Sequence, residues 1–486
     1  MALTVAALAK QPMSLYFDMP IPNLRSYLGR QKVGVDAVVR TTFARNEHPQ
    51  QVLDDWFAIL TPRIQEWPSL LDFEQDLRKK VGPMSVMRPL SERMDSIDDY
   101  FRFAYANQPL DDAAIKLLIK EWSMLRGMRL RSREHTLERM HLNTNSGPPY
   151  FTRRASVVDR LLPFDIQRTG DGDFKMALPE WEGLTCAVLG WRGQEGGPSV
   201  EDVKQRVIWM FPFALNLEEL RAYQVLIEGC QRYNLVPAWN GNEAVDVAVT
   251  RLFDTKARND LIVCTDFSGF DQHFNKGCQV SAQRVLSGLF SGSEYVDWVE
   301  NIYPAKYNIP LCIQEGLFAT GPHGMGSGSG GTNPDETVFH RALQLEAALR
   351  SGSVLNKNSL CLGDDGCLSY PGISVDDVVA CYTSHGLEMN PSKQYASTED
   401  CTYLRRWHHH DYRRGGICVG VYSTARALGR LLYMERFIDP EKWGPRAIAM
   451  RQLSVIENCR YHPLGEDFVK FCVKRDKFRL GIDIPG

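Results

Sequence analysis

The stretch LCLGDDGCLSY, residues 360–370, places two adjacent carboxylates, Asp364 and Asp365, between glycines and apolar residues. Asp-Gly between two apolar runs indicates a tight β-hairpin, because glycine supplies a positive φ and aspartate tolerates one. The alternative interpretation is a pair of ligands for a divalent cation, since Mg²⁺ prefers oxygen ligands. The turn alone leaves both interpretations open, and a second acidic position elsewhere in the chain is needed to decide between them.

A second acidic position follows the run LIVCT, which is typical of a fully buried strand and ends directly before Asp266. A carboxylate just past a buried strand packs poorly, but it suits a ligand that must be fixed on a rigid scaffold. If the strand and the hairpin lie side by side, Asp266 and Asp364 meet, although the spacing alone does not place them together. Such a pair would suit phosphoryl transfer, in which two metal ions about 3.5–4 Å apart hold the attacking and leaving oxygens.

Phosphoryl transfer also needs groups that hold phosphates. The G-x-x-x-x-G-K-[ST] motif is absent from the sequence, which excludes a P-loop ATPase. The glycine-rich run from Gly324 to Gly331 is the candidate, because glycines allow close backbone approach and free N–H groups attract anions. It leads into a predicted helix with Asn333 as N-cap, Pro334 at the first position and Glu336 completing a capping box. A flexible linker is the alternative, and the capped helix start argues against it.

Composition sets the broad class of the protein. The 486 residues predict two to four domains or subdomains. The net charge of −3 means that any nucleic-acid binding must use local basic surfaces. Twelve cysteines without a C-x-x-C pair argue against a disulfide framework or a zinc site and favour a reducing compartment. We expect neither a signal peptide nor a membrane span, since no apolar run reaches 18 residues.

Other elements must position these acids. Long helices with many basic residues are expected over residues 111–141, a loop over 143–154, and a strand that begins with the basic KQR at Lys204. A helix is expected to follow the hairpin, and the last ~75 residues read as helix-rich.

Three motifs in order carry a resemblance to a known family. DFSGFD (266–271), SGSGGTN (327–333) and GDD (363–365) resemble motifs A, B and C of viral RNA-dependent RNA polymerases. GLEMNPSK (386–393) resembles motif D, CTYLRR motif E, KQRVI motif F and NSGPPY motif G. The matches run from about residue 143 to residue 406, and DFSGFDQHFN and SGSGGTN are most similar to picobirnaviruses, small double-stranded RNA viruses related to partitiviruses.

The resemblance implies an α+β right-hand polymerase with fingers, a palm built on an antiparallel sheet, and a helical thumb. Residues 1–240 would form an N-terminal extension and the fingers, 241–410 the palm with a fingers return at about 276–318, and 411–486 the thumb. The implied partners are an RNA template and product and NTPs, with a viral capsid protein as a further candidate and no membrane. The implied role is replication and transcription of an RNA virus genome in the virion interior and the host cytoplasm.

The resemblance also implies roles for single residues. Asp266 and Asp364 would ligate two Mg²⁺ ions, with Mn²⁺ as an alternative metal, while Asp365 assists and the Phe267 carbonyl supplies a further ligand. Lys393 would be the general acid that protonates the leaving pyrophosphate.

Further residues would bind the NTP. Lys204 and Arg206 would hold the triphosphate, and Asp271 would sense the ribose 2′-OH, which separates RNA from DNA precursors. The motif B residues implied in NTP binding are Ser327, Gly328, Thr332 and Asn333. Many members of the family carry Asn nine residues after the motif B serine, where this chain has Glu336. Asn333 is the candidate to supply the amide instead.

Two other classes are weighed against the polymerase. A reverse transcriptase usually has an aromatic residue at the position of Asp271 and YxDD where this chain has LGDD. A non-catalytic RNA-binding or capsid protein has no reason to keep separated acids at strand ends beside a glycine-rich helix start. Metal-dependent nucleotide incorporation on an RNA template separates the three.

An arginine-rich segment follows the motifs, and we predict that it forms part of the RNA exit surface. Its arginines are Arg405, Arg406, Arg413, Arg414, Arg426 and Arg430. The alternative is a solvated face paired with acids from elsewhere. On the exit-surface hypothesis, Arg413→Ala with Arg414→Ala weakens primer–template binding irrespective of sequence, and the slope of log K against log[salt] becomes shallower by about one unit per lost contact. Wild-type affinity and slope across a salt series would rule this surface out.

Overall fold

The buried strand before Asp266 and the acidic hairpin belong to one antiparallel sheet in the computed structural model. Its strands, in spatial order, are β12 (Leu360–Leu362), β13 (Asp365–Leu368), β9 (Ile262–Thr265) and β14 (Tyr395–Ser397). Gly366 pairs with Thr265, and Leu362 pairs with Asp365 across the hairpin. All four residues of β9 are buried, as a β-branched apolar run favours. The predicted adjacency of this strand and the hairpin is therefore confirmed.

The structure describes residues 14–16, 20–35, 39–170, 172–436, 438 and 440–485. The chain divides into two compact units. Unit 1 contains the described residues up to Lys32, together with Leu90–Gly190 and Val207–Thr398. Unit 2 contains the described residues of Val33–Pro89, Trp191–Arg206 and Glu399–Gly486. The division into fingers, palm and thumb at residues 240 and 410 stays a prediction.

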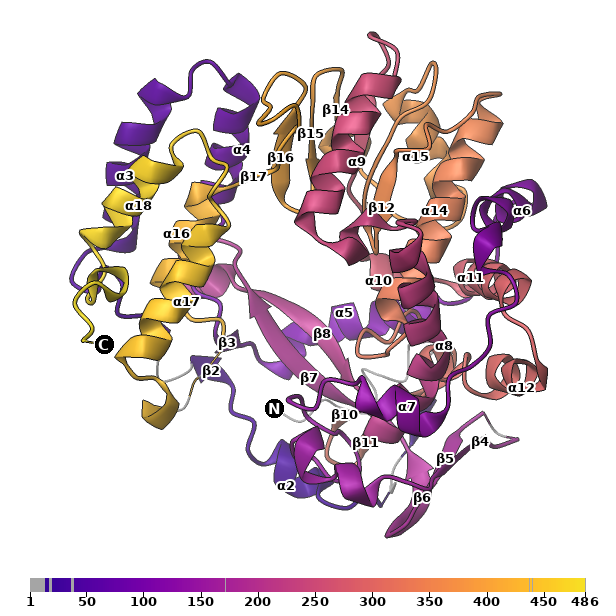
Figure 1. The fold of residues 1–486 in the computed structure, drawn as a ribbon. Helices are drawn as coiled ribbons and strands as arrows, with labels where there is room; N and C mark the ends of the chain where they lie inside the picture. The colour runs from indigo at the N-terminus through magenta and orange to yellow at the C-terminus, as the bar shows by residue number, and fades with distance from the viewer. Residues whose placement is uncertain are drawn as a thin grey trace. The chain divides into compact units, whose positions relative to one another are not determined.

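Helix α14 (Thr332–Arg350) is the central helix of unit 1, and most of its residues are buried. Helices α6 (Asp112–Glu121), α11 (Lys276–Leu289) and α15 (Val375–Thr383) pack against it (Figure 1). The apolar residues Val338, Phe339 and Leu343 of α14 join the main hydrophobic core. Its buried residues also include several charged and polar side chains, so α14 must find partners for them on more than one side.

A second sheet of five strands has the order β1 (Ser14–Tyr16), β11 (Leu317–Thr320), β10 (Leu311–Gln314), β7 (Ala187–Gln194) and β8 (Lys204–Met210). A meander of β4 (Asp165–Arg168), β5 (Phe174–Leu178) and β6 (Trp181–Thr185) forms a third sheet. The remaining helices of unit 1 are α2 (Leu24–Leu28), α5 (Leu90–Arg102), α7 (Arg133–Glu138), α8 (Phe213–Arg232), α9 (Asn242–Thr255), α10 (Phe270–His273), α12 (Ser293–Asn301) and α13 (Ala305–Asn308).

Unit 2 joins an early segment of the chain to the C-terminal one. Its helices are α3 (Pro49–Arg63), α4 (Pro68–Arg78), α16 (Thr424–Leu432), α17 (Pro445–Glu457) and α18 (Gly465–Val473), and its strands include β2 (Gly34–Val35), β3 (Val86–Met87), β15 (Asp400–Tyr403), β16 (Arg406–His409) and β17 (Val421–Tyr422). The Trp56 indole donates to Thr424 Oγ1 at 2.8 Å, and its ring packs 5.1 Å from that of Phe468. The two segments thus share one core, and the helix-rich C-terminal region is confirmed.

Two expectations about helices need correction. Helix α14 begins at Thr332 with Gly331 as its N-cap, so the predicted N-cap at Asn333 is wrong. The side chain of Asn333 does not cap the helix, because it accepts the Trp239 indole N–H instead. The helices expected over residues 111–141 are the two short helices α6 and α7.

Candidate active site

The predicted acidic residues gather at one end of the four-stranded sheet. Asp266 directly follows β9 and is exposed, and Asp364 is exposed at the tip of the β12–β13 hairpin. The turn consists of Gly363 and Asp364, with Gly363 at a φ of 58° that favours glycine. Because Gly366 pairs with Thr265, the antiparallel register continues to Asp365 beside Asp266. The sheet therefore brings Asp266, Asp364 and Asp365 together.

Two side chains of α14 hold the backbone of the hairpin turn. The Gly363 N–H donates to Thr337 Oγ1 at 2.9 Å, and His340 Nδ1 lies 2.8 Å from the Gly363 carbonyl oxygen. Burial lowers the pKa of His340 to about 4, so a neutral imidazole donates its Nδ1–H to that carbonyl. A Cβ atom on Gly366 would lie 2.6 Å from His340 Cε1, which explains the glycine there. Helix α14 thus fixes the position of Asp364.

The same face of α14 presents a fourth carboxyl group to the site. Glu336 is buried, and burial raises its pKa well above the usual range, with further contributions from the charge of Asp271, a hydrogen bond with Asp271 and the charge of Asp364. Burial also raises the pKa of Tyr100, with the Asp271 and Glu336 carboxylates adding to the effect. The carboxyl groups of Asp271, Asp364 and Glu336 therefore lie close to one another around the hairpin turn.

The glycine-rich loop packs against the segment that carries Asp271. Asp271 lies on the short helix α10 and is half-buried. Its carbonyl oxygen accepts the Met325 N–H at 2.8 Å, and a Cβ atom on Gly324 would lie 2.3 Å from that oxygen. Only glycine fits at this close backbone approach, so the loop and Asp271 are held in one arrangement.

The rest of the loop rests on strand β8 and helix α8. Ser327 Oγ donates to the Val207 carbonyl at 3.1 Å, and Asn216 Nδ2 donates to the Gly328 carbonyl at 3.2 Å. A Cβ atom on Gly328 would lie 1.6 Å from the Trp209 carbonyl oxygen, so no other residue fits without a backbone shift. The glycines of this loop therefore serve close packing, and the flexible-linker alternative is wrong.

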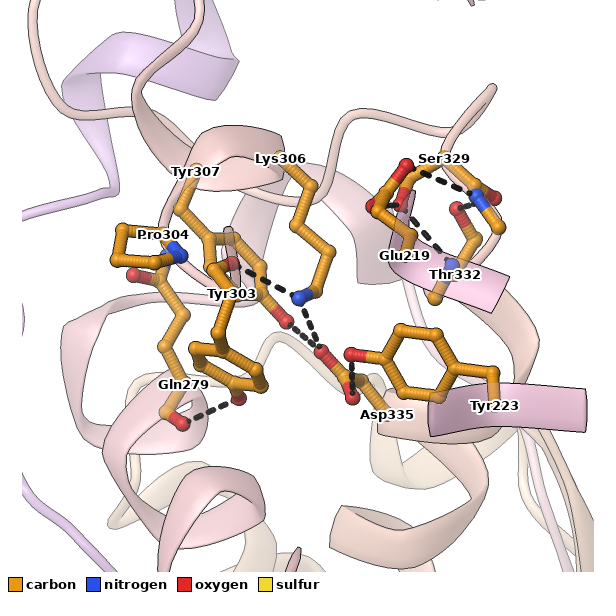
Figure 2. Close-up of polar contacts among 12 residues, drawn as sticks. Glu219, Tyr223, Gln279, Tyr303, Pro304, Lys306, Tyr307, Ser329, Thr332 and Asp335 are labelled. Carbon is orange, nitrogen blue, oxygen red and sulfur yellow. Dashed lines mark hydrogen bonds and ion pairs between the residues drawn. The ribbon is translucent and has the colours of Figure 1, made fainter. Parts of the chain in front are cut away.

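A buried ion pair lies at the start of α14 (Figure 2). Lys306 Nζ lies 3.1 Å from Asp335 Oδ2, and both side chains are fully buried. The hydroxyls of Tyr223 and Tyr307 donate to Asp335 at 2.7 and 2.6 Å, and Lys306 donates to the Tyr303 carbonyl at 2.9 Å. Buried charges are costly unless they are paired and hydrogen-bonded, and this pair has both kinds of partner.

Glu219 ties the end of the loop to helix α8. Its carboxylate accepts the Ser329 hydroxyl and, at 3.4 Å, the Gly330 N–H (Figure 2). Burial raises the pKa of Glu219 to about 7. Thr332 Oγ1 lies 3.2 Å from the carbonyl oxygens of Gly326 and Ser329, which closes the loop onto the helix start.

Gln394 directly precedes β14, the strand next to β9, and binds the backbone of Asp266. Its Oε1 accepts the Asp266 N–H at 2.7 Å, and its Nε2 donates to the Asp266 carbonyl at 2.9 Å. Lys393 precedes it on an exposed 3₁₀ turn, Pro391–Lys393. The sequence motif indicates Lys393 but not Gln394, because nothing in it signals that a side-chain amide binds both the N–H and the carbonyl of Asp266.

Lys204 and Arg206 lie in unit 2, at the start of β8, and both are exposed. Arg206 Nε donates to Gln194 Oε1 at 3.1 Å. A cavity of about 160 Å³ within unit 2 is lined by Arg192, Arg206, Arg405, Arg426 and Arg430, together with Glu195 and Glu435.

The arginines of the arginine-rich segment have different kinds of partner. Arg426 and Arg430 pair with Glu195 at 3.2 and 3.6 Å, so pairing with acids, the alternative to an exit surface, holds for these two. Arg406 is buried and donates to the Gly420 carbonyl at 3.3 Å. Arg414 is exposed, and the role of Arg413 and Arg414 in RNA binding stays a prediction.

The acidic end of the sheet fits a hard divalent cation. Its donors are carboxylate oxygens of Asp266, Asp364 and Asp365, with the Phe267 carbonyl next in the chain, and Mg²⁺ prefers oxygen ligands. The carboxyl groups of Asp271 and Glu336 lie close to these donors, and a cation would offset their negative charge.

Another group with metal-ligand chemistry, Glu346, Cys381 and His385, is buried among the described residues. The Arg350 guanidinium lies 2.5 Å from Glu346 and 3.3 Å from His385, so a cationic side chain of the protein already balances the charge of this group.

Comparisons with known proteins agree with these motifs. The profile of a family described as viral RNA-dependent RNA polymerase matches residues 173–428. A curated human picobirnavirus protein named "Potential RNA-dependent RNA polymerase" is 54% identical over 477 residues, 97% of this chain and 89% of that protein. Two crystal structures of a human picobirnavirus RNA-dependent RNA polymerase, one with its insertion loop deleted, match with a TM-score of 0.93 and 53% identity over 97% of this chain and 90% and 93% of theirs. The predicted α+β right-hand polymerase fold is confirmed.

The buried ion pair gives a testable prediction about stability. Lys306→Met leaves Asp335 with two tyrosine hydroxyls but without a cation, and we expect a loss of about 3–5 kcal/mol in the free energy of unfolding. Urea unfolding measures the loss. Lys116→Met, on the exposed face of α6, is the control and should stay within about 0.5 kcal/mol of wild type. Wild-type stability of the Lys306 variant would show that Asp335 does not depend on the ammonium group.

Proposed function

Because the chain belongs to the viral RNA-dependent RNA polymerases and is therefore an RNA-directed nucleotidyltransferase, we propose that it copies viral RNA from NTPs by two-metal nucleotidyl transfer. The observation that carries this mechanism is the pairing of β9 with the acidic hairpin, which sets Asp266, Asp364 and Asp365 at one end of a sheet. The attacking group is the 3′-OH of the growing RNA, the bond formed joins it to the NTP α-phosphate, and pyrophosphate leaves.

The chain's own groups prepare this reaction. Divalent cations are the cofactors of the family; Asp266 and Asp364 would hold two Mg²⁺ ions, or Mn²⁺ in their place, with Asp365 and the Phe267 carbonyl assisting. When bound, the ions activate the 3′-OH and balance the charge of the phosphates. The Gln394 amide clamp keeps the Asp266 backbone in place, and α14 keeps the hairpin turn in place. Both carboxylates are thus presented without reorganisation.

Other residues would bind the NTP and help pyrophosphate to leave. Lys204 and Arg206 would hold the triphosphate, with Arg206 suited to a bidentate grip. Lys393, exposed beside the Gln394 clamp, would donate a proton to the leaving pyrophosphate. Around the sugar, Asp271 would accept from the 2′-OH, while the loop residues Ser327, Gly328 and Thr332 and the helix residue Asn333 would shape the pocket.

The partners follow from this activity. They are an RNA template, its RNA product and NTPs. We further propose that a viral capsid protein is a partner, and that replication and transcription of the RNA genome take place in the virion interior and the host cytoplasm. Among the described residues, no helix is both long and apolar enough to cross a membrane.

The metal assignment is tested at the hairpin tip. Asp364→Asn should lower nucleotide addition by at least about 10²–10³-fold, because a neutral amide is a weaker cation ligand, while folding stays intact at this exposed position. Incorporation of labelled NTPs into a primed RNA template measures it, with Asp376→Asn on the exposed start of α15 as the control. Near-normal turnover in the folded variant would exclude Asp364 as a metal ligand.

Sugar selection is tested at Asp271. Asp271→Ala should lower kcat/KM for rNTPs more than for dNTPs, so that the ratio of the two kcat/KM values falls by about tenfold or more. The reason is that a site built to pair a hydroxyl loses its preference for that hydroxyl when the pairing group is removed. Both sugars are measured on the same template. If the ratio stays at its wild-type value, discrimination lies with other residues such as Thr332 or Asn333.

A further inference from the structure

The side-chain amide of Asn333 is held in one orientation by a tryptophan outside the sequence motifs. The Trp239 indole N–H donates to Asn333 Oδ1 at 2.9 Å. An indole nitrogen is a donor only, so the amide oxygen must face the ring and the NH₂ group must face away from it. This contact joins residues 94 positions apart and replaces the helix cap that the sequence predicts for Asn333.

The NH₂ group of Asn333 faces the hairpin turn. A Cβ atom built on Gly363 would lie 3.6 Å from Asn333 Nδ2 and 3.5 Å from Glu336 Oε2. The Asn333 amide and the Glu336 carboxyl group therefore both lie close to one point beside Gly363. A hydroxyl group both donates and accepts, so it suits a point beside Asn333 Nδ2 and Glu336 Oε2.

Glu336 cannot replace the amide that many family members carry at its position. Its carboxyl group is hydrogen-bonded with Asp271 and lies in the negative field of the site. The Glu336 carboxyl group is already engaged by Asp271, whereas the Asn333 NH₂ group offers two hydrogens. The donor to a sugar hydroxyl must therefore come from Asn333, one turn earlier on α14.

Trp239 is itself well anchored. It lies on a 3₁₀ turn, Pro237–Asn240, its carbonyl accepts Gln231 Nε2 at 2.9 Å, and its ring packs against the main core of unit 1. The indole N–H is thus fixed by the fold. A free asparagine amide can rotate and present oxygen or nitrogen, so fixing it removes an ordering cost on binding.

We propose that Trp239 is a positioning residue for sugar selection, because it turns the Asn333 NH₂ group toward the ribose of the incoming NTP, where it pairs with the hydroxyl that Glu336 also contacts. The inference rests on the proposed polymerase function. A dNTP lacks the 2′-OH and leaves the oriented NH₂ group unpaired, which penalises binding of the dNTP.

The test uses Trp239→Phe, which keeps an aromatic ring and removes the N–H donor together with the five-membered ring that carries it. We expect kcat/KM for rNTPs to fall about tenfold, mainly through KM, with little change for dNTPs, so that the rNTP/dNTP ratio narrows. Trp239→His, which restores a ring N–H, should recover part of the ratio. Trp181→Phe on β6 is the matched control and should leave the ratio unchanged.

Asn333→Asp completes the experiment, because it keeps the acceptor for Trp239 and removes the NH₂ group. It should lower the rNTP/dNTP ratio of kcat/KM as Trp239→Phe does. The double variant, Trp239→Phe with Asn333→Asp, should have a ratio no lower than that of either single variant. A wild-type ratio in folded Trp239→Phe, or in Asn333→Asp should the Phe variant not fold, overturns the proposal, as does a fully additive double variant. Failure of the wild-type protein to incorporate rNTPs with Mg²⁺ would instead refute the proposed function.

Discussion

The grip of helix α14 on the Gly363–Asp364 turn is the constraint on which the rest of the site depends. Thr337 and His340 hold the N–H and the carbonyl of Gly363, and the hairpin in turn pairs with β9. An exposed acidic turn would otherwise be free to move, since adjacent carboxylates repel each other. Fixing its backbone lets Asp364 stay exposed to ligands while its position is set by a buried helix.

Helix α14 can do this only because its other buried charges are paired. Asp335 faces Lys306 and two tyrosine hydroxyls, so the helix start is anchored on the side opposite the hairpin. The glycine-rich loop before it is seated on Trp209 and tied to Glu219 by close contacts that exclude larger residues. The loop, the helix and the hairpin therefore form one supported structure around Asp271 and Asp364.

Local sequence patterns predicted the part of the site that depends on local chemistry. The β-branched run before Asp266 and the Asp-Gly pattern identified a strand and a hairpin, although the turn itself is Gly363–Asp364, and their adjacency followed from the resemblance. The side-chain contacts could not be predicted, because Gln394 reaches Asp266 across 128 positions and Trp239 reaches Asn333 across 94. The capping-box pattern at Asn333 failed for the same reason, since a long-range donor binds the side chain that was expected to cap the helix.

The proposed mechanism requires Asp266 and Asp364 to hold divalent cations at the end of this sheet. The most direct measurement is a crystal structure of the protein soaked with Mn²⁺ and a non-hydrolysable NTP, with anomalous differences recorded at the manganese edge. We expect manganese peaks beside the Asp266 and Asp364 carboxylates. Peaks elsewhere, for example at Glu346, Cys381 and His385, with none between these two aspartates, would contradict it.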